Sequence, residues 1–325
     1  MVTEEILSHY NWSLRVKDRL KIRVFKRRWE IPGEEFAPQY YSCAFMNYAG
    51  KEVFGLSSHS SSIVSQTISI LEAYERLFMR TKGIKNSNGC AIHSSPEQSE
   101  KAAKFEVMER DAYLRFHYLG QIYSKKIYNH IIQNNSLIEV LQKNGIGIQI
   151  RLLGKNKHGF ATLASANGFN AKNPFGITIG LGFKDSLECS IESAFSELIR
   201  MINNQFSNEH RLPPISFESF QSHSNPGVHE HIRLGLDLQY GDFLKKRYED
   251  ASLNESILPD APSFIVKTEK AILPGVETPE LYFSYAQSED LVNIKFGKDQ
   301  KYIEKVFNKE KVLKFNKCIA IHILG

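Results

Sequence analysis

The sequence is poor in the features that mark metal-binding, secreted and membrane proteins. Its four cysteines are scattered along 325 residues, with no C-x-x-C pair and no histidine at ligand spacing. This argues against a zinc site or a disulfide framework and fits a reducing cytosol. The chain has no apolar run long enough to span a membrane and no hydrophobic signal segment at its start. We therefore expect a cytoplasmic protein without a membrane span.

The excess of positive charge is small and lies early in the chain. The formal net charge is +5, and much of the excess falls between Lys17 and Arg28, in KDRLKIRVFKRR. A basic run of this kind can contact nucleic acid. No nucleic-acid fold motif accompanies it, and the other basic residues are interleaved with acids, so we expect no nucleic-acid partner. A solvated face and a docking surface for an acidic peptide are the interpretations that remain.

What the sequence does contain is one pattern that occurs three times. A glycine in a glycine- and serine-rich turn is followed 17 residues later by a glutamate in a helical segment; the pairs are Gly55–Glu72, Gly89–Glu106 and Gly180–Glu197. A fixed spacing of this kind is typical of an internal repeat. The repeated unit is predicted to be a strand, a turn and a helix.

The first two copies end in the same E-x-x-E-R motif. Positions i, i+3 and i+4 share one face of a helix, so the three charged side chains of each motif should project together. Ser65 and Ser69 extend the first stripe backwards, and the rest of that helix is apolar on nearly every side. A helix of this kind is buried, and we expect its polar stripe to line an internal cavity. The motifs are Glu72, Glu75 and Arg76, then Glu106, Glu109 and Arg110, whereas the third copy keeps Glu197 and Arg200.

Buried carboxylates at this density need cations, because several close anions cannot all remain charged without partners. Oxygen ligands with no His or Cys beside them suit Mg²⁺, which is usually held by a few carboxylates and substrate phosphates. The alternative is a solvated helix face with an i,i+4 ion pair, worth only tenths of a kcal/mol. The repetition favours the metal site, with Glu72, Glu75, Glu106 and Glu109 as its ligands.

These motifs resemble the YcaO superfamily from about Tyr40 to Met201. The stretches that carry the resemblance are GLSS…LEAYER, SNGCAIHSS…FEVMERD and GLGFKDS…AFSELIR. The resemblance implies antiparallel sheets flanked by helices, with ATP and Mg²⁺ as cofactors. It also implies that ATP activates a peptide amide: a nucleophile adds to the carbonyl, the hemiorthoamide oxygen is phosphorylated, and phosphate leaves.

The resemblance also assigns a nucleotide site. Ser94 and Gln98 stand where many relatives carry Asn and Glu, and Arg200 replaces a frequent Gln. The cofactor-binding set is Ser69, Glu72, Glu75, Arg76, Ser94, Gln98, Glu106, Glu109, Arg110, Glu197 and Arg200.

The C-terminus departs from many cyclodehydratases because it ends in His322-Ile-Leu-Gly325 without prolines. His322 is the one residue there that titrates near neutrality and can serve as a catalytic base. A strand histidine with a satisfied hydrogen bond is the other interpretation.

The expected reaction is formation of thiazoline or oxazoline rings in a ribosomal precursor peptide. Thioamide or amidine formation and a non-catalytic scaffold are the alternatives. Residues 1–38 are predicted to be an N-terminal extension, too short for a folded recognition domain, and residues 39–325 a single YcaO domain. We therefore expect a separate E1-like leader-recognition subunit as a partner. A flavin dehydrogenase and a second copy of the chain are further partners compatible with the resemblance.

The pattern of elements favours an α+β fold with hairpin-paired strands over a doubly wound parallel sheet. A hairpin should turn at Ala49-Gly50, and His223, His229 and His231 are expected in a polar loop. Further strands and a short helix are expected near the C-terminus. The other helices are predicted near Glu4–Tyr10, Ser61–Thr81, Pro96–Leu119, Asn135–Lys143 and Leu187–Asn203.

Overall fold

The computed structural model divides the chain into two compact units, and α3 (Pro96–Leu119) contributes residues to both. The first unit comprises Met1–Val107 and Ser263–Glu289, and the second comprises Met108–Pro262 and Asp290–Gly325. The structure describes residues 3–31, 34–84, 86–119, 125–126, 135–206, 212–249, 258–259, 262–277 and 279–292, with isolated residues from there to 319.

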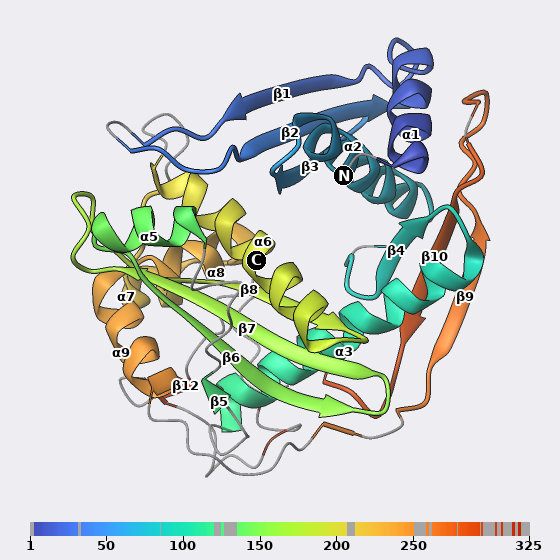
Figure 1. Ribbon diagram of the computed structural model, residues 1–325. Helices are drawn as coiled ribbons and strands as arrows, with labels where there is room; N and C mark the ends of the chain where they lie inside the picture. Colours follow the sequence, from blue (N-terminus) through green and yellow to red (C-terminus); the bar gives the residue numbers. More distant parts are fainter. Residues whose placement is uncertain are drawn as a thin grey trace. The chain divides into compact units, whose positions relative to one another are not determined.

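The first unit contains two antiparallel three-stranded sheets (Figure 1), in the orders β1-β2-β3 and β4-β10-β9. Helix α2 packs against β2 and β3. The elements are α1 (Glu4–Arg15), β1 (Arg23–Arg28), β2 (Tyr40–Tyr48), β3 (Lys51–His59), α2 (Ser62–Thr81), β4 (Cys90–His93), β9 (Ile265–Lys270) and β10 (Tyr282–Gln287).

The second unit is built on an antiparallel sheet of order β5-β6-β7-β8, and α6 packs against β7 and β8. Its elements are β5 (Lys125–Lys126), α5 (Ser136–Lys143), β6 (Gly147–Asn156), β7 (Gly159–Gly168), β8 (Phe175–Lys184), α6 (Leu187–Phe206), α7 (Phe217–Ser222), α8 (Val228–Gly235), α9 (Leu238–Glu249), β11 (Lys314–Phe315) and β12 (Cys318–Ile319).

This mixture of helices and antiparallel sheets confirms the predicted α+β class. The hairpin turns where predicted, since Ala49 and Gly50 take the positive φ values of 50° and 76° that a two-residue type I′ turn requires. The division of the chain at residue 38 stays a prediction, and the described part of that segment, α1 and β1, belongs to the first unit. Within the described residues, no helix is both long enough and apolar enough to cross a membrane.

One expectation about a loop is wrong. The predicted polar loop at His229 and His231 is helix α8, which begins after Gly227 because the Glu230 carboxylate accepts a hydrogen bond from the Gly227 N–H at 2.8 Å. His231 is buried, and its ring packs edge-on against Phe220. One of the strands expected near the C-terminus covers residues 291–297; its described residues 291, 292 and 294 are not in a strand, and the others lie outside the described residues. Most of the predicted C-terminal helix lies outside the described residues.

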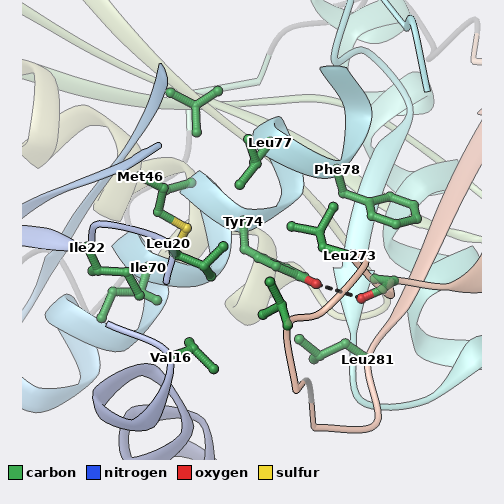
Figure 2. Close-up of a cluster of buried hydrophobic side chains, with 14 of the residues drawn as sticks. Val16, Leu20, Ile22, Met46, Ile70, Tyr74, Leu77, Phe78, Leu273 and Leu281 are labelled. Atoms are coloured by element: carbon green, nitrogen blue, oxygen red, sulfur yellow. Dashed lines mark hydrogen bonds between the residues drawn. The ribbon is translucent and has the colours of Figure 1, made fainter. Parts of the chain in front are cut away.

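The core of the first unit forms around one face of α2 (Figure 2). Tyr74 and Leu77 are fully buried there, among apolar side chains of α1, β2 and the segment after β9. The Tyr74 hydroxyl donates to the Ala271 carbonyl at 2.7 Å, so the one polar atom of this ring is satisfied. Each large apolar side chain buried in this way stabilises the fold by about 1.5–3 kcal/mol.

The predicted repeat is confirmed at the level of single hydrogen bonds. Each motif has a serine ten residues after its glycine, and each of these serines is fully buried. Its hydroxyl lies within hydrogen-bonding distance of carbonyl oxygens on two paired strands. The pairs are Tyr40 and Ser57 for Ser65 (3.1 and 3.2 Å), Ala91 and Tyr282 for Ser99 (both 2.9 Å), and Phe160 and Gly182 for Ser190 (2.8 and 2.9 Å).

The glycines of the first and third motifs let the helix lie directly on the strand. A Cβ on Gly55 would stand 2.2 Å from the Ser69 carbonyl oxygen, and one on Gly180 would stand 2.2 Å from that of Ala194. The serine side of α2 therefore faces its sheet. The expectation that Ser65 and Ser69 line an internal cavity is wrong, because small side chains at these positions serve close helix–sheet packing.

We expect Gly55→Ala and Gly180→Ala to lower the free energy of unfolding by at least about 1–3 kcal/mol, the usual cost of overpacking. Urea denaturation followed by circular dichroism measures this loss. Gly227→Ala is the control, since the nearest atom to its added Cβ is 3.5 Å away and belongs to a flexible side chain. Equal unfolding midpoints for all three variants would contradict the packing argument.

Candidate functional site

The first glutamate of each motif is fixed to the strand of its own repeat. One carboxylate oxygen accepts a hydrogen bond from a backbone N–H at or beside the motif glycine. The distances are 2.6 Å from Leu56 to Glu72, 3.1 Å from Gly89 to Glu106, and 2.6 Å from Leu181 to Glu197. The spacing of 17 residues is therefore the length of chain that returns a helix to its own strand.

The second glutamate holds the strand of the next motif. Glu75 Oε2 accepts a hydrogen bond from the Ile92 N–H at 3.0 Å, and Glu109 accepts one from the backbone of Phe183. Ile92 and Phe183 each lie three residues after the glycine of their motif. In the third motif Arg200 occupies the equivalent position.

The arginines of the motifs partly offset the negative charge. Arg76 Nη2 donates to Glu72 Oε1 at 2.7 Å, and Arg200 Nη2 donates to Glu197 Oε1 at 3.3 Å. Arg110 Nη1 lies 3.8 Å from Glu109 Oε1, and both of these side chains are about 15% exposed.

In the first unit, ionisation of the Glu75 carboxyl is opposed by its surroundings. Burial raises its pKa well above the ordinary value, and the charges of Glu106 and Glu72 raise it further. The Ile92 N–H and Arg76 act in the opposite direction but do not compensate. The residue as a whole is intermediate between buried and exposed.

In the second unit, Glu109 is a carboxyl whose pKa is raised in the same way. Burial raises the pKa of Glu109 to about 7, and the Glu197 carboxylate also raises it, whereas Arg110, Lys184 and the Phe183 N–H lower it. The structure thus brings Glu72, Glu75 and Glu106 together in one unit, and Glu109, Arg110 and Glu197 together in the other.

The donor atoms fit Mg²⁺ in chemistry and number. In the part of the chain that the structure describes, no three or more His, Cys, Asp or Glu side chains are grouped so as to hold a metal by themselves. Mg²⁺ differs from most protein-bound metals in needing only one or two carboxylates when phosphate oxygens complete its shell. Carboxylates with one oxygen fixed on a backbone N–H are suited to supply the other oxygen.

The remaining predicted residues lie in varied surroundings. Ser69 is fully buried and its hydroxyl donates to the Gln66 carbonyl at 2.8 Å, so its side chain does not face a ligand. Ser94 donates to the Glu5 carboxylate, and Gln98 is exposed in the first turn of α3. His322 lies outside the described residues.

Sequence reasoning missed two groups beside the motifs. Lys184, directly after β8's GLGF stretch, lowers the pKa of Glu109. Asp111 follows the second E-x-x-E-R motif and is 1% exposed; it accepts hydrogen bonds from Arg115 and from the Val292 N–H at 2.7 Å. The only available signal for Asp111 was its place directly after the motif, and for Lys184 there was none.

The raised pKa of Glu109 makes folding stability depend on pH. The folded protein holds this proton up to about pH 7, but the unfolded chain releases it near 4.5. The free energy of unfolding should therefore fall as pH rises from about 4.5 to 7, by on the order of 3 kcal/mol from this group. Glu109→Gln should flatten that slope in urea unfolding measured across the range. The exposed Glu192→Gln should not, and equal slopes for native protein and Glu109→Gln would contradict the assignment.

Three solved structures share the fold of this chain. One is a chain of the E. coli microcin synthetase McbBCD complex with pro-MccB17 bound: it is 12% identical, the match covers 92% of this chain and 96% of that one, and the TM-score is 0.59. A heterocyclase in complex with substrate and cofactor is 10% identical over 97% of this chain and 58% of its own, with a TM-score of 0.56. YcaO from Methanopyrus kandleri, bound with AMPPCP and Mg²⁺, is 11% identical over 96% and 95%, with a TM-score of 0.53. At these identities the likeness concerns the fold.

Comparison of the sequence with protein families identifies the family of the chain. No curated protein matches the chain. The model of the YcaO family, described as a cyclodehydratase that binds ATP and Mg²⁺, matches residues 65–256, which is more than half of the chain and includes all three glutamate motifs except the first glycine. ATP and Mg²⁺ are the cofactors of this family, and its members are ATP-dependent enzymes of the cyclodehydratase type. The protein belongs to the YcaO family.

Proposed function

We propose that the protein uses ATP and Mg²⁺ to form thiazoline or oxazoline rings in a ribosomal precursor peptide. A Cys thiol or a Ser or Thr hydroxyl of the peptide adds to the preceding carbonyl carbon, and the carbonyl becomes a hemiorthoamide. ATP supplies the phosphoryl group that makes the former carbonyl oxygen a leaving group. Loss of phosphate breaks the C–O bond and leaves a C=N bond, so the oxygen of the amide departs with the phosphate.

The observation that carries this proposal is the pair of carboxyls whose pKa is raised, Glu75 and Glu109. Each has one firm backbone hydrogen bond, and each is opposed in ionisation by burial and by a neighbouring glutamate. A divalent cation would offset this cost, and phosphoryl transfer depends chiefly on charge neutralisation and positioning. Glu72, Glu75, Glu106 and Glu109 are the proposed metal ligands, and Arg76, Arg110 and Arg200 are the proposed sources of positive charge for the phosphates.

A second candidate reaction is thioamide or amidine formation. Mass spectrometry of a treated precursor peptide distinguishes the products, because a ring loses water, whereas a thioamide exchanges oxygen for sulfur.

We expect the protein to bind a non-hydrolysable ATP analogue in a Mg²⁺-dependent manner, measured by calorimetry. Glu72→Gln, Glu75→Gln and Glu109→Gln should each weaken Mg²⁺-dependent binding by at least about tenfold, equivalent to about 1.4 kcal/mol. Each removes one negative charge that faces the cation while keeping an oxygen for the backbone N–H. Glu192→Gln, an exposed position on α6, is the control. Absence of binding by the native protein, or unchanged binding by all three variants, would contradict the proposal.

We further propose that a separate leader-recognition subunit supplies most of the affinity for the precursor peptide. The fold of this chain occurs in a synthetase complex that contains other subunits and a bound peptide, which supports a division of the work between subunits. The purified chain should therefore convert peptide very slowly and accelerate when the partner is added, measured as product formed per minute. Full peptide-dependent turnover by the chain alone would contradict this.

A further inference from the structure

The sheet β1-β2-β3 has two edges, and side chains of α2 close one of them. Arg80 Nη1 donates to the Glu52 carbonyl at 2.6 Å, and Arg76 Nη1 donates to the Phe54 carbonyl at 2.8 Å. The Leu56 N–H is taken by Glu72. Each of these alternate residues of β3 thus has one outward backbone group bonded to an α2 side chain, so an added strand would have to displace those side chains.

The other edge is β1, and its outward groups follow from the register. The two-residue turn makes Tyr48 and Lys51 a hydrogen-bonded pair, so every second residue of β2 bonds to β3 and the others bond to β1. The β1 residues that lie opposite this second set of β2 residues, and therefore bond to β2, are Arg23, Phe25 and Arg27. The N–H and C=O groups of Val24, Lys26 and Arg28 must then point away from the sheet. The same alternation places residues 52, 54 and 56 of β3 outward, which agrees with the contacts of α2.

The β1 edge is basic and carries one exposed aromatic side chain. Lys26 and Arg28 are exposed, and neither forms an ion pair with any residue that the structure describes. Phe25, on the other face of the strand, is 62% exposed. An unpaired edge strand is a template for another strand, and these charges would select an acidic one.

We infer that the outer edge of β1 binds an acidic, extended segment of the peptide substrate as an added strand. The backbone of the segment pairs with Val24, Lys26 and Arg28, its acidic side chains lie beside Lys26 and Arg28, and an apolar side chain packs against Phe25. This inference rests on the proposed function in one respect, namely that the segment belongs to the substrate.

The size of the edge favours a substrate peptide over a permanent subunit. A stable subunit interface buries about 800 Å² on each partner, which a strand of six residues with three outward-facing positions does not offer. Short backbone pairing helped by exposed charges gives reversible, salt-sensitive binding. A substrate must be released after reaction, so this strength of binding suits it.

The test uses fluorescence anisotropy with a labelled synthetic peptide of alternating Glu and Val, without ATP. We expect the full chain to bind it, and to bind much more weakly a peptide of the same sequence with alternate backbone nitrogens methylated. Lys26→Pro should reduce affinity by at least about tenfold, because proline removes an outward N–H and leaves the ladder to β2 intact. The double variant Lys26→Glu, Arg28→Glu should do the same through charge. Lys157→Glu, an exposed lysine in the turn between β6 and β7, should bind normally.

Nucleotide binding by calorimetry keeps this test separate from the proposed function. Every variant should bind the ATP analogue like the native chain, which also shows that it is folded. If the native chain binds the peptide but not the nucleotide, the proposed function is contradicted and the docking edge is supported. If it binds the nucleotide but not the peptide, only the docking edge is contradicted.

Four results would overturn the inference. Equal affinity for the methylated peptide, or full binding by Lys26→Pro, would mean that charge alone attracts the peptide. A change of oligomeric state in the double variant would make the edge a contact between copies of the chain. Tighter binding of single-stranded RNA than of the peptide would make it a nucleic-acid surface. If the native chain binds no peptide and the double variant Lys26→Gln, Arg28→Gln aggregates, the two charges serve only to prevent edge-to-edge aggregation of β1.

Discussion

The hydrogen bond from a strand N–H to a helix glutamate is the interaction on which the rest of this structure depends. It occurs in all three repeats and, through the second glutamates, it also joins the first motif to the second and the second to the third. Charge-assisted bonds of this kind are shorter and stronger than neutral ones. The glycines and buried serines bring helix and strand close enough for the bond to form. Stability and site geometry are therefore set by the same atoms.

That arrangement has an electrostatic cost, which ties the fold to its cofactors. Each carboxylate is held near another, and burial makes the charge harder to maintain, so the pKa values of Glu75 and Glu109 are raised. The arginines of the motifs reduce the cost without removing it. A protein of this family binds ATP with Mg²⁺, and the function proposed above assigns a divalent cation to offset the charge of these carboxyls.

Much of this could be predicted from the sequence, because the glycine–glutamate spacing is a local signal that three copies reinforce. The helices around the motifs, the hairpin at Ala49-Gly50 and the α+β class follow from it or from turn chemistry. The packing of Ser65 and Ser69 against the sheet could not be predicted, because the same polar stripe in a sequence is compatible with a helix that faces a cavity and with one that packs closely on a sheet. Helix α8 was missed because its start depends on a Glu230 side chain that caps Gly227, and a Pro-Gly pair ordinarily indicates a loop. The role of His322 stays a prediction.

The third motif lacks a second glutamate, and this affects how the repeats are linked to one another. Glu75 and Glu109 each hold the strand of the following repeat, but Arg200 stands where a third such glutamate would be, so the series of linkages has a beginning and an end. Each of these two carboxyls has a second oxygen beside the one that accepts the N–H of β4 or β8. A ligand bound to that second oxygen would therefore be tied, through a single side chain, to the strand of the following repeat.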